Sequence, residues 1–138
     1  MCAIFGCVNV DISPKQFASA LDTMNHRGPD GEGYFKTKVN DYIINFGHKR
    51  LSILDIKDGT QPMSSKNDSI VVVYNGEIYN AKSLRDELTS KGYIFFSTNS
   101  DTEILIHGFE EWGEDLPLHL DGMWSFAIFD KHKKKNIF

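Results

Sequence analysis

Cys2 is the first residue of the sequence that could do covalent chemistry. A free cysteine side chain reacts as its thiolate, and because its ordinary pKa is about 8.5 it needs a base nearby. If Met1 is removed, Cys2 acquires an α-amino group whose reference pKa of ~7.7–8.0 lets it take up a proton near neutral pH. One residue would then supply nucleophile and base, as in variants of the serine triad that use the chain's own N-terminus. The alternative is that Cys2 only fills a core strand.

Four further polar positions could serve a substrate beside such a nucleophile. Asn75 and Gly76 follow an apolar run, and their side-chain amide and backbone N–H can point at one place, as an oxyanion hole requires. The guanidinium of Arg50, which ends a predicted turn at 47–50, suits a carboxylate held at two points. Asp101 stands at a predicted helix N-terminus. The structural alternatives are an Asn-Gly hairpin turn, a surface charge for Arg50 and an N-cap for Asp101.

The elements that would position these residues begin with a strand at 2–8, which is apolar on both faces and therefore expected to be buried on both sides. Ser13, Pro14 and Gln16 form the pattern of a capped helix start, with Ser13 as the N-cap. Residues 26–31 end that helix in a loop. β-branched or aromatic runs predict further strands at 42–46, 51–54, 70–74 and 93–96.

The second half of the chain adds two helices and a hairpin. A helix is predicted at 83–91, and the pattern of residues 100–103 predicts a capping box that opens another helix. A strand at 122–129 is followed by a turn and by its partner at 137–138. Hairpin-linked strands mixed with helices predict an α+β fold, and strands apolar on both faces imply a second sheet inside and helices outside. Because the chain ends within this hairpin, we expect a C-terminally truncated domain, the alternative being a short final strand.

Composition narrows the class of protein. A length of 138 residues suits one domain, and a net charge of −4 lacks the basic footprint of a nucleic-acid-binding protein. No apolar stretch approaches the ~20 residues that span a bilayer, and no signal-peptide pattern is present, so we expect no membrane partner and a cytoplasmic location. Cys2 and Cys7 are too far apart along one strand to form a disulfide.

Seven segments, taken in order, resemble the class II glutamine amidotransferase domain, and that of asparagine synthetases in particular. They are residues 1–6, 26–31, 47–53, 61–63, 75–80, 100–103 and 122–127. Each segment is a weak signal alone, but the seven in this order are specific and span essentially the whole chain. The resemblance implies an N-terminal nucleophile hydrolase fold, in which two facing antiparallel sheets lie between helix layers (αββα).

The resemblance also implies a role for each candidate residue. Cys2 would attack the side-chain amide of glutamine, with its α-amine as base and later as acid, and Asn75 with Gly76 would form the oxyanion hole. The residues implied in substrate binding are Arg50 for the α-carboxylate, Asp101 for the α-ammonium, and Glu77 and the backbone of Ile53 for the pocket wall. The loop at 26–31 would shape the pocket, with Arg27 and Asp30 holding loops by ion pairing.

Two features depart from the family pattern. The family has glycine after the nucleophile where this chain has Ala3, which would strain the site if that residue had a positive φ. The ATP-dependent synthetase domain is absent, so residues 1–138 are expected to be an incomplete glutaminase domain.

The expected activity is therefore glutamine hydrolysis through a Cys2 thioester, which supplies ammonia to a ligase that makes asparagine from aspartate. The chain itself would need no metal or other cofactor, and ATP and Mg²⁺ are implied only for the missing synthetase domain. Glutamine and that synthetase domain are the expected partners, and the resemblance allows a homodimer. The alternatives are another acceptor (a sugar phosphate, phosphoribosyl pyrophosphate or another carboxylate) or a catalytically weak module that binds glutamine or a partner.

Overall fold

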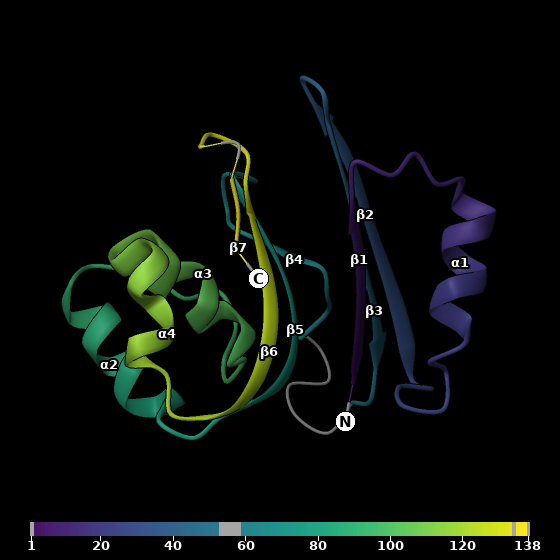
Figure 1. The fold of residues 1–138 in the computed structure, drawn as a ribbon. Helices are drawn as coiled ribbons and strands as arrows, with labels where there is room; N and C mark the ends of the chain where they lie inside the picture. The colour runs from purple at the N-terminus through teal and green to yellow at the C-terminus, as the bar shows by residue number, and fades with distance from the viewer. Residues whose placement is uncertain (1, 53–58, 134, 138) are drawn as a thin grey trace.

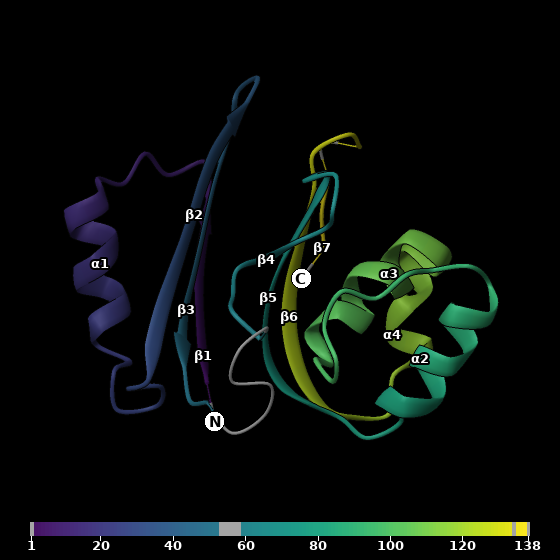
Figure 2. The same ribbon diagram turned by 180° about the vertical axis from the view of Figure 1, so that it is seen from behind.

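The structure, a computed structural model, describes residues 2–52, 59–133 and 135–137. Two antiparallel sheets lie face to face, and helices cover the outer side of each (Figures 1 and 2). Helix α1 (Pro14–Asp22) lies on one outer side, and helices α2 (Ala81–Ser90), α3 (Thr102–Trp112) and α4 (Leu116–His119) lie on the other. This arrangement confirms the predicted α+β fold with two sheets between helix layers.

The first sheet has the strand order β1-β3-β2. Its strands are β1 (Ala3–Val8), β2 (Gly31–Val39) and β3 (Tyr42–Arg50), and Ala3 pairs with Lys49. This pairing brings Cys2, just before β1, to the same end of the sheet as the last residues of β3. Within β1 only Ala3 is buried, so the prediction of a strand buried on both sides was wrong. The reason is that β1 is an outer strand of the described sheet.

The second sheet has the order β4-β5-β6-β7. Its strands are β4 (Met63–Ser64), β5 (Ile70–Ile78), β6 (Gly122–Asp130) and β7 (Lys135–Ile137). Successive residues of β5 point to opposite faces, as in any strand. Val71 and Val73 face the first sheet and form a shared core with Ile44, Phe46, Ala127 and Phe129. Val72, Tyr74 and Ile78 face the helix layer instead.

Local helix signals in the sequence correspond closely to the structure. Ser13 caps α1 and forms the predicted capping box with Gln16, while Pro14 is the first helical residue. The predicted helix at 83–91 is α2, and the helix expected after residues 100–103 is α3. A short 3₁₀ turn, η1 (Gly113–Asp115), links α3 to α4. The described residues form no helix long and apolar enough to cross a membrane.

Two predicted turns are strands. Residues 47–50 continue β3, and residues 75–77 continue β5, so the hairpin-turn interpretation of Asn75-Gly76 is also wrong. Glycine serves close packing at both places. A Cβ on Gly47 would lie 2.6 Å from a ring atom of Phe17, and one on Gly76 would lie 2.3 Å from the carbonyl oxygen of Met123.

Other strand predictions also need correction. Residues 93–96 form no strand; the backbone N–H of Phe96 instead donates to the buried carboxylate of Glu103, at 2.7 Å. Leu51 and Ser52 follow β3 without strand structure, and the rest of the predicted strand at 51–54 lies outside the described residues. Strand β2 was not predicted, although its residues alternate between half-buried and exposed.

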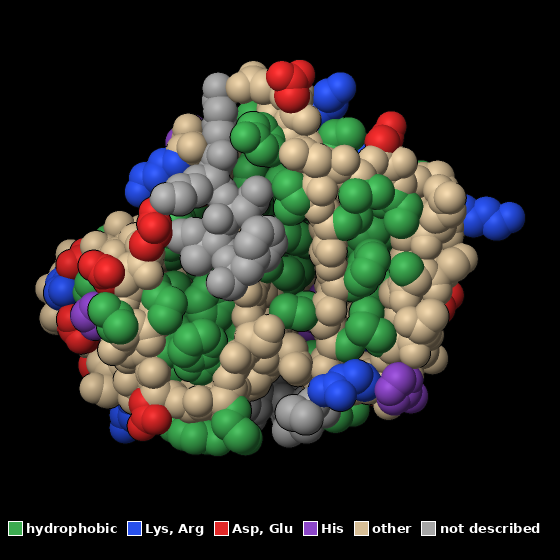
Figure 3. All heavy atoms as spheres, in the orientation of Figure 1, with side chains coloured by type: hydrophobic (Ala, Val, Ile, Leu, Met, Phe, Trp, Pro, Cys, Tyr) green, Lys and Arg blue, Asp and Glu red, His purple; other side chains and the backbone are tan. Residues whose placement is uncertain are grey.

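The charged surface gives no sign of a nucleic-acid site on the face shown in Figure 3. Its Lys and Arg side chains are spread apart and lie among Asp and Glu side chains, so they form no basic patch there.

Candidate active site

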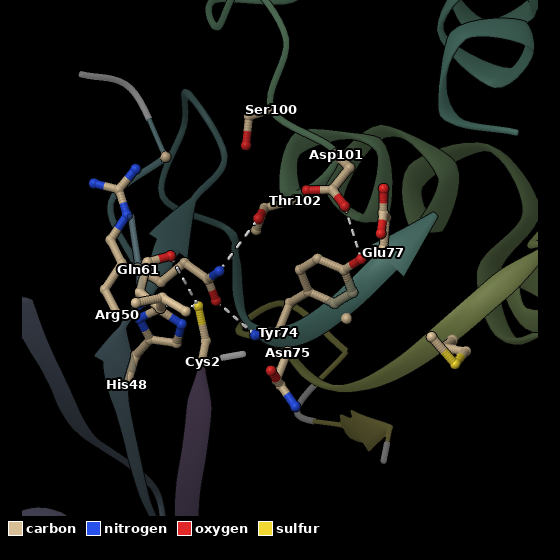
Figure 4. A pocket seen from close by; sticks show the side chains of 14 residues that line it. Cys2, His48, Arg50, Gln61, Tyr74, Asn75, Glu77, Ser100, Asp101 and Thr102 are labelled. Carbon is tan, nitrogen blue, oxygen red and sulfur yellow. Dashed lines mark hydrogen bonds between the residues drawn. The ribbon is translucent and has the colours of Figure 1, made fainter. Parts of the chain in front are cut away.

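A cavity of about 310 Å³ lies at the end of the two sheets that holds Cys2. Residues from β3, β5, β6 and the start of α3 line it, together with Cys2 (Figure 4). Its described lining residues are Cys2, His48, Arg50, Leu51, Gly59, Gln61, Tyr74, Asn75, Gly76, Glu77, Ser100, Asp101, Thr102 and Met123. The cavity thus contains six of the seven candidate residues named from the sequence. The seventh, Ile53, lies outside the described residues.

Hydrogen bonds from Leu51 and Arg27 hold Cys2 at the cavity wall. The backbone N–H of Leu51 donates to the Cys2 sulfur at 3.4 Å, and the Nε of Arg27 donates to the Cys2 carbonyl oxygen at 3.2 Å. Cys2 and Cys7 are both free, as predicted. They stand an odd number of residues apart on one strand, so their side chains point to opposite faces. Only Cys2 lies on the face between the sheets.

The loop at 26–31 braces this wall in a way that differs from the prediction. The expected role of Arg27 and Asp30 was an ion pair, but the bonds that the structure gives them go to backbone atoms. Arg27 binds the carbonyl of Cys2, and Asp30 accepts a 2.8 Å hydrogen bond from the N–H of Ser52. Each side chain therefore positions a segment next to the cavity.

The two oxyanion-hole candidates lie side by side in β5, across from β6. Asn75 pairs with Ser125 and Gly76 with Trp124. The side-chain oxygen of Asn75 is buried and has no hydrogen-bond partner among the described atoms. That oxygen is a hydrogen-bond acceptor, so the part of Asn75 that could stabilise an oxyanion is its amide NH₂ group. The Asn75 amide and Cys2 line the same cavity.

Asp101 does not cap α3 with its side chain, so its interpretation as a simple N-cap was wrong. Its Oδ2 accepts hydrogen bonds from the Tyr74 hydroxyl at 2.7 Å and the Ile78 N–H at 3.4 Å. Burial raises the pKa of Asp101, and the hydrogen bond from Tyr74 acts in the opposite direction. The predicted capping box fails as well, because the carboxylate of Glu103 binds the backbone of Phe96 and Ser97.

Arg50 and Asp101 supply opposite charges to the cavity from different elements. Arg50 is the last residue of β3, and Figure 4 shows the two side chains on opposite sides of the cavity. Glu77, on β5, adds a second carboxylate to the lining. An amino acid carries both a carboxylate and an ammonium group, so this separation of charges suits a zwitterionic ligand.

His48 is a cavity residue that the sequence analysis missed as a functional candidate. It is only 1% exposed, and its Nε2 has no hydrogen-bond partner among the described atoms. Burial, and then the positive charge of Arg50, lower the pKa of His48 to about 4, so the ring is neutral at pH 7. One feature of the sequence could have identified it. Side chains two residues apart in a strand lie on the same face, so His48 lies on the face that carries Arg50.

The buried neutral histidine predicts acid sensitivity. The pKa of His48 is about 4 in the folded state and 6.5 in the unfolded state. As the pH falls from 6.5 to 4, His48 therefore gains a proton mainly in the unfolded state. Stability is therefore full above pH 6.5 and declines toward pH 4, by roughly 3 kcal/mol at most. We expect His48→Gln to remove much of this decline when unfolding by urea is measured at pH 7 and pH 4.5. Replacing the exposed His26 by Gln should leave the decline intact; an unchanged decline in His48→Gln would contradict the assignment.

Ala3 does not strain the site. The described residues that combine a side chain with a positive φ are Asn9, Asn40 and Asp68, so Ala3 is outside this group. It lies in β1 opposite Lys49, with ordinary strand pairing. The condition under which Ala3 would strain the site, a positive φ, is therefore not met.

The described residues include no group of three or more His, Cys, Asp or Glu side chains placed to hold a metal ion. Among the described lining residues, the groups available for chemistry include a thiol, two amides, two carboxylates, a guanidinium and a neutral imidazole.

Comparison with known proteins agrees with this arrangement. The family model described as "Glutamine amidotransferase domain" matches residues 1–138, so the chain belongs to that family. It is 41% identical to Asparagine synthetase [glutamine-hydrolyzing] 3 of Bacillus subtilis, over 99% of this chain and 22% of the relative. It is 38% identical to Asparagine synthetase [glutamine-hydrolyzing] 3 of Arabidopsis thaliana, over 98% of this chain and 22% of the relative. The chain thus spans less than a quarter of the length of these two relatives.

A solved structure supports the fold. Glutamine phosphoribosylpyrophosphate amidotransferase of B. subtilis, complexed with ADP and GMP, superposes with a TM-score of 0.73. The match covers 93% of this chain and 35% of the other at 21% sequence identity, so it shows that the two share a fold.

Proposed function

We propose that residues 1–138 are a glutaminase domain that hydrolyses glutamine to glutamate and ammonia. The observation that carries the proposal is that Cys2, Arg50, Asn75, Gly76 and Asp101 line one cavity. These groups come from four different parts of the chain, and each is the chemical type that its step requires.

The reaction follows from the groups present. With Met1 removed, the α-amine of Cys2 takes the thiol proton, and the sulfur attacks the side-chain carbonyl carbon of glutamine. The oxygen gains negative charge, which the Asn75 amide and the Gly76 N–H stabilise. The protonated amine then gives its proton to the amide nitrogen, the C–N bond breaks and ammonia leaves. A γ-glutamyl thioester remains on Cys2. Water attacks the thioester, the amine again moves the proton, and glutamate is released with the free thiol.

Substrate binding uses the two charged sides of the cavity. Arg50 binds the α-carboxylate of glutamine, and Asp101 binds its α-ammonium group. Glu77 lines the same pocket, and Ile53 is assigned to its wall by the family resemblance. A pocket that recognises both charges favours free glutamine over an amide within a peptide, where neither group is charged.

The ammonia would serve the remainder of a longer protein. Because the relatives named above are asparagine synthetases, the acceptor we propose is aspartate, activated as aspartyl-AMP by a synthetase domain that uses ATP and Mg²⁺. The proposed location is the cytoplasm. Glutamine hydrolysis is tested by measuring glutamate release by the full-length protein from which Met1 has been removed. The proposed acceptor is tested by measuring asparagine formation that depends on aspartate and ATP. Absence of glutamate release from a processed, folded protein would refute the proposal.

Arg50→Lys is expected to be a severe change although it keeps the charge. Lysine cannot grip a carboxylate at two points as the planar guanidinium does. We expect KM for glutamine to rise about tenfold or more, equivalent to ~1.4 kcal/mol. Lys36→Arg, which alters a surface ion pair with Asp11 away from the cavity, is the control and should leave KM unchanged. An unaltered KM in Arg50→Lys would show that Arg50 does not bind the substrate.

A further inference from the structure

The Asp101 carboxylate is held in place by the neighbouring strand β5. Tyr74 is only 3% exposed, and its ring packs in the core between β5 and the helices. Its hydroxyl reaches the cavity and donates to Oδ2 of Asp101 at 2.7 Å, and the N–H of Ile78 donates to the same oxygen. Figure 4 shows the other carboxylate oxygen directed away from Tyr74, toward the side where Ser100 and Thr102 lie.

Gln61 fixes Tyr74 and the start of α3 relative to each other. Its side-chain oxygen accepts a 2.6 Å hydrogen bond from the Tyr74 N–H, and its Nε2 donates to the Thr102 hydroxyl at 3.3 Å. Thr102 is the first residue of α3 and follows Asp101 directly. The Gln61 side chain therefore bridges the backbone of Tyr74 and the start of α3. The bond from the Tyr74 hydroxyl to Asp101 is a second link between β5 and the start of α3.

We propose that Tyr74 is a positioning residue that orients the Asp101 carboxylate and thereby makes the cavity selective for amides that carry an α-ammonium group. The inference rests on the proposed glutaminase function. A hydrogen bond to an ionised group costs more to lose than one between neutral groups, and loss of this one leaves Oδ2 of the half-buried carboxylate with the longer, 3.4 Å bond from the Ile78 N–H. The Tyr74 hydroxyl donates to Asp101, so its effect on substrate binding passes through that carboxylate.

The charge state of Asp101 gives the proposal a second signature. The charged or titratable groups that line the cavity with it are Cys2, His48, Arg50, Tyr74 and Glu77. Burial raises the pKa of Asp101, and the Tyr74 hydroxyl lowers it by stabilising the charged form. Removing the hydroxyl therefore leaves a higher pKa. Since an ammonium group binds the charged carboxylate, KM for glutamine will begin to rise at a higher pH as the solution is acidified, whereas kcat/KM also follows protonation of the Cys2 α-amine.

The experiment is steady-state kinetics of glutamine hydrolysis by the full-length, processed protein and its Tyr74→Phe variant, which keeps the ring in the core. We expect KM for glutamine to rise about tenfold, kcat to change less than threefold, and the increase of KM at acid pH to begin at a higher pH. The inhibition constant of 4-carbamoylbutanoate, which has the carboxylate and amide of glutamine without the ammonium, should stay within twofold. Tyr93→Phe removes a comparable hydroxyl-to-carboxylate bond, to Glu111, on the surface and should change none of these values.

The possible outcomes separate the two proposals. If KM and its pH dependence are unchanged in Tyr74→Phe while the parent protein is active, the positioning role is overturned and the glutaminase function still stands. Equal loss of affinity for glutamine and for 4-carbamoylbutanoate, or a loss confined to kcat, also overturns it, because the effect would not pass through the ammonium group. A processed parent protein without glutaminase activity overturns both proposals.

Discussion

Replacement of Asn75 by alanine should lower kcat for glutamine hydrolysis by about 10²–10³, a loss of ~2.7–4 kcal/mol of transition-state stabilisation. The amide contacts the substrate oxygen most strongly once that oxygen carries negative charge, so the loss falls on kcat and leaves KM within a few-fold. The backbone N–H of Gly76 remains, and activity should therefore be reduced steeply without being abolished. The test is steady-state kinetics with a melting curve on the same sample.

Asn45 provides a matched control for Asn75. It is also an asparagine in a strand, fully buried where Asn75 is half-buried, and its side chain binds the Tyr34 hydroxyl and the Val10 carbonyl, away from the cavity. Asn45→Ala should lower the melting temperature and keep a normal kcat. If Asn75→Ala instead shows a lowered melting temperature with a normal kcat, then Asn75 supports the strand and has no part in an oxyanion hole.

Replacement of Cys2 by alanine should reduce glutaminase activity below detection, by more than ~10⁴-fold, because no other group in the cavity can form the thioester. Glutamine should still bind, since Arg50 and Asp101 are unaltered, and this is measured by isothermal titration calorimetry. Cys7→Ala, on the opposite face of the same strand, should retain activity. In the full-length protein an ammonium salt supplied in place of glutamine should still support product formation by Cys2→Ala. Appreciable glutamine hydrolysis by Cys2→Ala would contradict the mechanism.

The parts of the fold that the sequence predicted correctly depend on contacts between near neighbours. The start of α1 is an example, because Ser13 and Gln16 satisfy each other within one turn of helix. The position of Cys2 relative to Cys7 is another, because a strand's period of two separates their faces whatever the rest of the fold does.

The errors arose where distant segments decide the local structure. Asn-Gly is typical of a tight turn, but nine residues of β5 pair with β6, and this pairing extends through Asn75 and Gly76. The pattern at 100–103 is typical of a capping box, yet Asp101 and Glu103 bind partners elsewhere that satisfy them better. Tyr74 and Phe96 supply those partners, and no sequence spacing reveals them.

The sequence named candidate site residues by type but could not give their surroundings. Cys2 and Arg50 were candidates because their chemistry suits an amide and a carboxylate, and the family resemblance gave Asp101 its role toward an ammonium group. These three residues line one cavity. His48 and Tyr74 were missed because their importance comes from burial and from the groups they face. Both sit in apolar or turn-like runs, where a histidine or tyrosine gives no signal of its own.

The most direct test of the central claim is covalent labelling by the glutamine analogue diazo-oxo-norleucine, followed by intact-mass measurement and peptide mapping. The full-length protein should have lost Met1 and should gain one adduct, located on the N-terminal peptide at Cys2. Excess glutamine should slow the labelling, and Asn75→Ala should slow it as well. An adduct on Cys7, or no adduct on a folded protein that has lost Met1, would contradict the assignment of Cys2 as the nucleophile.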